Sequence, residues 1–139
     1  MSDSPAPPLP SPVLRGPGEA AALAVELVRP SACGVVALLL DDSRWPISSV
    51  VVTSAGTPRA LVEVADLIVE AAADAPQVAN VVMIAVRAGS TGVEPGDLDA
   101  LFEMSDAFDT LGVALIDLVV VTTDLVVPLM AAGGLGSRW

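Results

Sequence analysis

The chain has 139 residues and a net charge of −11, because seventeen acidic residues stand against only six basic ones, all of them arginine. It contains no histidine, lysine or tyrosine, and Cys33 is its single cysteine. Catalytic triads, Cys–His pairs and ordinary zinc sites need imidazoles or thiolates. The composition therefore excludes these three kinds of site, and we expect no metal and no cofactor.

The charge balance also limits the partners. Nucleic acids and anionic membranes attract clustered basic residues, which a chain with a pI near 4.1 lacks. No apolar run approaches the roughly 18 residues that span a bilayer. The N-terminus has no secretory pattern, and a lone cysteine, expected to be a buried apolar residue, fits a reducing cytoplasm. We expect a cytoplasmic protein without nucleic-acid or membrane partners, and the arginine-only basic set suggests a bacterial genome rich in G and C.

The length fits one domain, which we divide into three parts. Residues 1–17 hold six prolines and predict a disordered, proline-rich leader. Residues 18–130 predict the folded domain. Residues 131–139 predict a loose tail, in which Trp139 is the residue suited to dock on the core.

The first half of the domain predicts a helix, a hairpin and a second helix. The Ala-rich segment 18–28 is helical, and 34–40 and 47–53 are strands joined by a turn. A helix over 58–73 begins with Thr57 as N-cap and proline at its first position. Helical spacing places one set of residues of this helix in the core: Leu61, Val64, Ala65, Ile68 and Ala72. It places an acidic set in solvent: Glu63, Asp66, Glu70 and Asp74.

The second half predicts a strand over 79–86, a glycine-containing loop, a helix over 97–111, and strands over 113–121 and 125–129. The expected apolar face of this helix is Leu98, Leu101, Phe102, Phe108 and Leu111. Its expected polar face is Asp99, Glu103, Asp106 and Asp109. Hairpins mixed with helical crossovers indicate an α/β fold, a mixed sheet of about five strands covered by about three helices.

The segment 87–121 resembles the RadC-like branch of the MPN (JAMM) metallopeptidase-like domains. PGDLD at 95–99 stands where that family has Pro-Ser-x-x-Asp. LGV at 111–113 matches its Leu-Gly-Ile, and LID at 115–117 matches its Leu-Leu-Asp. The hairpin and the Gly-Thr pair before the second helix are also similar, so the likeness spans roughly 18–129. It implies the three-layer architecture of the MPN and cytidine-deaminase-like folds.

The same resemblance implies that the family's chemistry is lost. Family members hold zinc with two His and an Asp, and a Glu on the hairpin acts as general base. Here Ala85 and Arg87 stand at the His positions, Asp99 at the Asp position, and Val51 is the nearest match to the Glu. These four residues could neither hold zinc nor activate a zinc-bound water. Arg87 opposes a cation and favours a carboxylate, Asp97 or Asp99.

Two other sites come from the residues themselves. Asp97 and Asp99 are candidate Mg²⁺ ligands, although acids in the first turn also complement the helix dipole. The loop before this helix is a candidate anion pocket, with contacts from Arg87, Ser90, Thr91, Gly92 and Asp97, although it lacks the lysine of a P-loop. A flexible remnant loop is the simpler interpretation.

Three functions follow. The first is a catalytically inactive domain that works as a protein-interaction or scaffold module. The alternative is a small-molecule or anion sensor that uses the vacated pocket, and a weaker alternative is a divergent Mg-dependent hydrolase using Asp97 and Asp99. Because mean hydropathy is +0.71, we expect association with a second copy or a related domain. The expected surfaces are 125–129 with Met130, and the first helix; the acidic helix faces then point to solvent.

Overall fold

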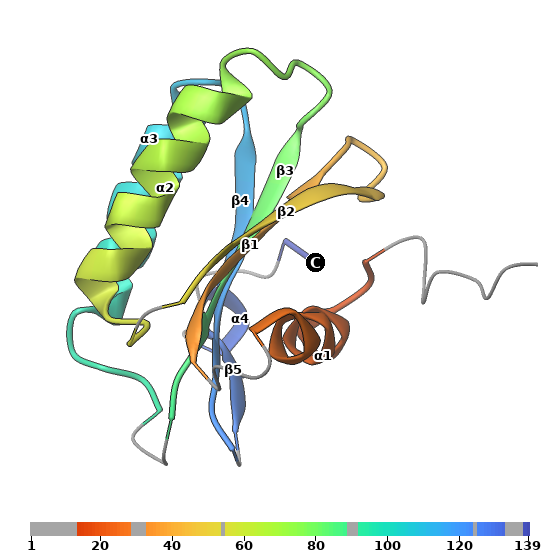
Figure 1. The fold of residues 1–139 in the computed structure, drawn as a ribbon. Helices are drawn as coiled ribbons and strands as arrows, with labels where there is room; N and C mark the ends of the chain where they lie inside the picture. Colours follow the sequence, from red (N-terminus) through yellow and green to blue (C-terminus); the bar gives the residue numbers. More distant parts are fainter. Residues whose placement is uncertain (1–13, 29–32, 54, 89–91, 124, 133–137) are drawn as a thin grey trace, which may run out of the picture.

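The computed structural model describes residues 14–28, 33–53, 55–88, 92–123, 125–132 and 138–139. The predicted order of helices and strands is confirmed, with one short helix added at the end (Figure 1). The elements are α1 (Pro17–Val28), β1 (Gly34–Leu40), β2 (Pro46–Val52), α2 (Pro58–Ala72), β3 (Asn80–Val86), α3 (Asp97–Asp109), β4 (Ala114–Val121), β5 (Val126–Pro128) and α4 (Leu129–Ala132).

The strands form one mixed five-stranded sheet in the order β2-β1-β3-β4-β5, as the fold class predicted. β1 pairs antiparallel with β2 on one edge and with β3 on the other. β3 and β4 are parallel and joined through α3, and β5 turns back antiparallel to β4. The parallel pair needs a helical crossover, and the hairpins need only short turns.

Helices cover both faces of the sheet. α1 packs on one face, while α2 and α3 lie side by side on the other (Figure 1). All seven residues of β1 are buried, and alternate residues serve the two cores. Val35, Ala37 and Leu39 face α2 and α3, whereas Val36, Leu38 and Leu40 face α1. We call the two faces the α2–α3 side and the α1 side.

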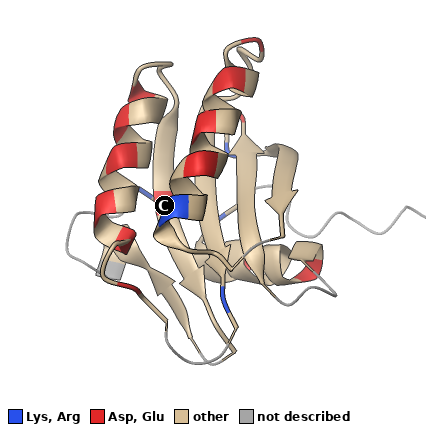
Figure 2. Cartoon of the chain, turned by 60° about the vertical axis from the view of Figure 1, so that its left-hand side comes forward, with Lys and Arg blue, Asp and Glu red and all other residues tan. Residues whose placement is uncertain are grey.

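α2 forms as its sequence predicts. The Thr57 hydroxyl accepts a hydrogen bond from the Ala60 N–H at 3.2 Å, which satisfies one of the unpaired donors at the helix start. All five residues expected in the core are buried, from Leu61 to Ala72. Apart from the buried Asp97, the acidic residues of α2 and α3 lie on the outward surface of these helices (Figure 2).

α3 packs with a different face from the one expected. Leu98 and Phe102, expected in the core, are 45% and 47% exposed, and Leu111 lies beyond the helix end and is also exposed. The buried residues of the helix are Asp97, Ala100, Leu101, Met104 and Phe108. Their spacing of three, four and seven is a regular helical stripe that starts at an aspartate. Leu101 and Phe108 were correctly expected in the core, but the expected face did not include Asp97, which is buried at the helix start where Leu98 was expected.

Gly34 allows the close approach of β1 and β2. A Cβ at this position would lie 2.7 Å from the Val52 carbonyl oxygen, closer than real Cβ contacts come. Cys33, just before it, is half-buried rather than buried as expected. The start of β1 therefore depends on the absence of a side chain at position 34.

Parts of both terminal segments pack on the α1 side. Leu14, placed in the leader by the sequence, is buried, and its N–H donates to the Arg44 carbonyl at 3.1 Å. Trp139 packs against the α1-side core. Residues 1–13 of the expected leader and 133–137 of the expected tail lie outside the described residues. Among the described residues, no helix is long and apolar enough to cross a membrane.

Candidate functional site

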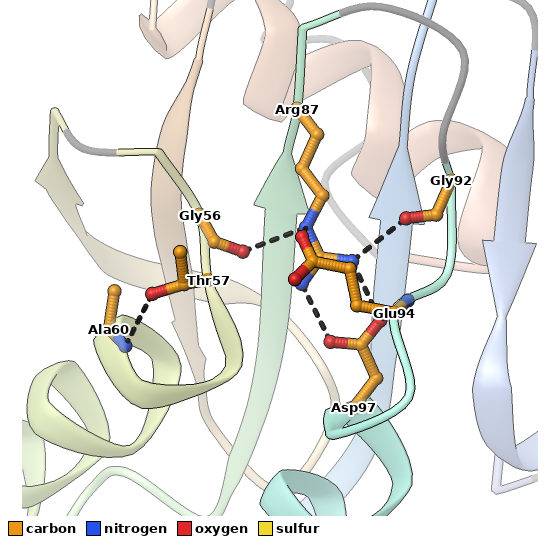
Figure 3. Close-up of polar contacts among 7 residues, drawn as sticks. All are labelled: Gly56, Thr57, Ala60, Arg87, Gly92, Glu94 and Asp97. Atoms are coloured by element: carbon orange, nitrogen blue, oxygen red, sulfur yellow. Dashed lines mark hydrogen bonds and ion pairs between the residues drawn. The ribbon is translucent and has the colours of Figure 1, made fainter.

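Arg87 lies directly after β3, at the end of the sheet where α2 and α3 begin (Figure 3). Its backbone N–H donates to the Val121 carbonyl at 2.8 Å and so continues the pairing of β3 with β4. The carboxyl ends of strands next to helix starts are the usual place for sites in α/β folds. The sequence resemblance singled out position 87, and the structure shows which groups surround the Arg87 side chain.

The Arg87 guanidinium bonds to three separate segments (Figure 3). Its Nε donates to the Gly56 carbonyl at 2.8 Å, ahead of α2. Nη1 donates to the Gly92 carbonyl at 3.0 Å, in the loop that leads to α3. Nη1 and Nη2 each donate to one carboxylate oxygen of Asp97 at 2.7 Å. This arginine therefore fastens the starts of both helices to the end of β3.

Asp97 completes the centre. It is fully buried, and besides the paired bonds from Arg87 its Oδ2 accepts from the Glu94 N–H at 2.6 Å. Glu94 adds a second carboxylate 3.5 Å from the arginine Nε. Two-pronged pairing between guanidinium and carboxylate is the strongest common form of ionic hydrogen bond. The expectation that a carboxylate faces Arg87 is confirmed for Asp97.

Gly56 is required at its position in this centre. Its φ of +71° lies in the left-handed region, and a Cβ there would lie 3.3 Å from the Val86 carbonyl oxygen and 3.4 Å from Cγ of Arg87. Glycine accepts this backbone conformation without strain. The Gly-Thr pair thus joins two functions: Gly56 receives the arginine, and Thr57 caps α2.

The positions assigned to a lost metal site do not come together. Ala85 is buried in the α2–α3-side core, but Val51 pairs with Val36 and so lies on the α1 side. Val51 therefore does not share a face with Ala85, because neighbouring residues of a strand point to opposite faces. Val50 and Val52 are the β2 residues that share a face with Ala85. Asp99 is exposed on α3.

The residues present do not fit zinc or magnesium. Both carboxylate oxygens of Asp97 bond to Arg87, while Asp99 lies on the exposed surface of the helix, so the two acids do not form a joint ligand set. Within the described ranges, no three His, Cys, Asp or Glu side chains gather where they could hold a metal. A guanidinium at the expected metal position repels a cation as well.

The expected anion pocket loses its main contact. The Arg87 side chain is 3% exposed, and its Nε, Nη1 and Nη2 are all used in internal hydrogen bonds. Gly92 offers it a carbonyl, and Asp97 a carboxylate, both of which an anion would avoid. Ser90 and Thr91 lie outside the described residues. The centre therefore acts as a structural clamp among the residues described.

A second polar centre was missed by the sequence reasoning. Asp117, in β4, is fully buried on the opposite side from Arg87. Its Oδ1 accepts from the N–H groups of Leu118 and Met130, both at 2.8 Å, and its Oδ2 accepts from Nε1 of Trp139 at 3.1 Å. Arg138 donates from Nη1 to the Leu115 carbonyl at 2.8 Å, and its own backbone carbonyl accepts from Nη2 of Arg44. The sequence signal that could have revealed this centre is the single aspartate within the otherwise apolar strand β4.

The two surfaces expected to associate lie next to each other. A shallow groove runs between α1 and the end of the sheet, and Ala21, Val25, Val121 and Val126 are among its lining residues. Val25 and Val126 are exposed where they line it, and Leu125, before Val126 in the sequence, is exposed as well. Leu129 and Met130, expected on this surface, are instead buried, because α4 turns them into the α2–α3-side core.

A scan against protein-family models finds no match to this chain, and a search of curated proteins finds none either. The residues named above and their arrangement are therefore the basis for any statement about function.

Proposed function

We propose that this chain is a catalytically inactive MPN/RadC-like domain that acts as a cytoplasmic protein-interaction or scaffold module. The observation that carries the proposal is the buried Arg87–Asp97 pair at the end of β3. In the resembled family this part of the fold holds a cation and activates water. Here a guanidinium takes that place, and its carboxylate partner is fully used in holding it.

The clamp also favours this function over the alternatives. A hydrolase using Asp97 and Asp99 needs both carboxylates toward one cation, but only Asp97 reaches the centre and Arg87 already bonds to both its oxygens. A sensor needs an arginine that can reach a ligand, but this one is buried and internally bonded. Neither alternative has an observation in its favour.

The interaction role is supported by the surface beside α1. Val25 of α1 and Val126 of β5 come from distant parts of the sequence, and both are exposed and line the groove. Exposed apolar areas mark contact surfaces in many soluble proteins. The fitting partner is a second copy of this chain or a related domain, and the outward acidic faces of α2 and α3 stay in solvent, where like charges do not meet.

Metal analysis of the full chain, purified without a metal-binding tag, tests the inactive half of the proposal. We expect no stoichiometric zinc, and no shift of the melting temperature with added Zn²⁺ or Mg²⁺, because a ligand that binds only the folded state raises its stability. One equivalent of tightly bound zinc per chain would contradict the proposal. Sedimentation of the same sample tests the interaction half, for which an assembly larger than the monomer is expected.

A further inference from the structure

The edge strand β2 is unusual in its exposure. It is the first strand in the sheet order, so alternate N–H and C=O groups of its backbone point away from β1. Among the described residues no other strand lies on that side. All seven of its residues are exposed or half-buried, unlike the seven buried residues of β1.

The strand also lacks the usual protection of sheet edges. Natural edges carry charges, prolines or bulges that prevent pairing with another chain. In β2 the proline stands at the first position, Pro46, and the register shift lies at the same end, between Leu39 and Leu40 of β1. In a chain with seventeen acids, the segment 45–57 contains no charged residue. Ile47 is the extra residue at that shift, because Ser48 pairs with Leu39 and Pro46 with Leu40, so the regular length from Ser48 to Val52 is open to pairing.

The two faces of β2 differ in how far other residues of the chain cover them. Val50 and Val52 pack against the α2–α3-side core. Ser49 and Val51 lie on the α1 side, since Val51 pairs with Val36 and Ser49 with Leu38. Val51 remains 37% exposed there, and Ile47, at the register shift, is 39% exposed. The uncovered apolar residues and the open backbone edge thus belong to the same strand.

We propose that β2 pairs antiparallel with β2 of a second copy, about a two-fold axis at Ser49, so that two sheets join into one. Ser49 is the middle of the strand, and pairing centred there sets Ile47 opposite Val51 of the second copy on both sides of the axis. This inference deepens the proposed interaction function by naming a second copy as partner and β2 as the contact.

A second copy fits this edge for three reasons. The register is self-complementary, because the apolar residues at 47 and 51 stand at equal distances from Ser49. Apolar pairs directly opposite each other stabilise antiparallel strands. Two chains of net charge −11 repel each other, and 45–57 is a stretch without acids at which they can meet. A two-fold contact of this kind is closed, so assembly ends at the dimer.

A cross-link at the axis tests the register. In a Cys33→Ala background, Ser49→Cys places two thiols at directly opposite positions, where Cα atoms are about 4.5–5.5 Å apart, within the range of a disulfide. We expect a covalent dimer on mild oxidation of the full chain. Leu67→Cys, equally accessible on the outer face of α2, is the matched control and is expected to stay monomeric on non-reducing gels.

Charged variants test the contact without a cross-link. Ile47→Lys and Val51→Glu alone are each expected to weaken the dimer by about tenfold or more in sedimentation equilibrium, because a charge is buried against an apolar partner. Mixing the two variants restores a dimer, since Lys then faces Glu across the axis. Circular dichroism and the melting temperature confirm that each variant is folded.

Val126→Glu separates this inference from the wider proposal. If Val126→Glu dissociates the dimer and the β2 variants do not, the contact lies at the α1–β5 groove, and the β2 inference is overturned while the interaction function stands. A wild type that stays monomeric at high micromolar concentration overturns β2 pairing and self-association together. The metal analysis is unaffected by either result, so the inactive half of the proposal is judged separately.

Discussion

Two aspartates are buried among the described residues, on opposite sides of one sheet, and they are stabilised in different ways. Asp97 faces a guanidinium, so its negative charge meets a positive one in the same dry space. The described partners of Asp117 are three N–H groups, from Leu118, Met130 and Trp139. An uncompensated buried charge is very unfavourable, so both arrangements satisfy the carboxylate, one by charge and the other by dipoles.

The difference also concerns what each aspartate holds in place. Arg87 and Asp97 fasten two loops and the start of α3, all of them within the main body of the fold. Asp117 fastens the start of α4 and the side chain of Trp139. Loss of the first centre therefore affects how the helices sit on the sheet. Loss of the second affects mainly the segments that follow β5.

Removal of the Arg87 guanidinium is expected to have the largest effect on stability. Arg87→Met leaves Asp97 buried without its partner, and the free energy of unfolding falls by about 3–5 kcal/mol, measured by urea unfolding. The double variant Arg87→Met, Asp97→Leu removes both charges and is expected to recover much of that loss. Arg59→Met, which breaks the exposed pair with Glu63, is the control and changes stability by about 0.5 kcal/mol or less. A single Arg87→Met variant as stable as this control would contradict the clamp.

Change at the second aspartate is expected to have an intermediate effect. Asp117→Asn keeps one acceptor oxygen but replaces the other with an amide NH₂. That NH₂ then faces an N–H group that donates to Asp117 in the wild type, so one hydrogen bond is lost. We expect a loss of about 1–3 kcal/mol in the free energy of unfolding, as for a buried hydrogen bond that is left unmade. A loss as large as that of Arg87→Met would show that this carboxylate also depends on a cation.

The smallest effect is expected at the end of the chain. Trp139→Phe keeps an aromatic ring on the α1-side core but removes the Nε1 donor, at a loss of about 0.5–1.5 kcal/mol. In the Asp117→Asn background the same change is expected to cost less, because the two groups share one bond. A double-mutant cycle measures this coupling, and a coupling of zero would mean that Trp139 does not bond to Asp117 in solution.

The parts of the fold that follow local rules were predictable from sequence. α2 has a capping threonine, a proline at its start and separate apolar and acidic faces, and all of these appear in the structure. α3 was predicted as a helix, and Leu101 and Phe108 were correctly placed in the core, but Leu98 and Phe102 were not. The helix buries Asp97 against Arg87 instead, and a pairing with a residue ten positions earlier is not visible in the helical pattern.

The candidate site was partly predictable from the charges of its residues. A positive charge at Arg87 implied a nearby carboxylate, and the sequence offered two, of which geometry chose Asp97. The side of the sheet on which Val51 lies could not be predicted from a run of valines. An unbroken apolar stretch does not show which residues point to which face. In β4 an extra residue, Ile116, shifts the pairing between Val81 and Val82, so strict alternation also fails there. The bond between Asp117 and Trp139 joins residues with no shared local motif.

The place of β1 between β2 and β3 has a consequence for folding. β1 and β2 are joined by a short turn, so their hairpin can form from one continuous stretch of chain. β3 comes only after α2, and pairing with it requires closure of a longer loop. During synthesis the hairpin therefore precedes its neighbour, with both edges open and with no charge between residues 45 and 57. The strand suited to join two folded copies is thus also the segment by which unfinished chains would aggregate.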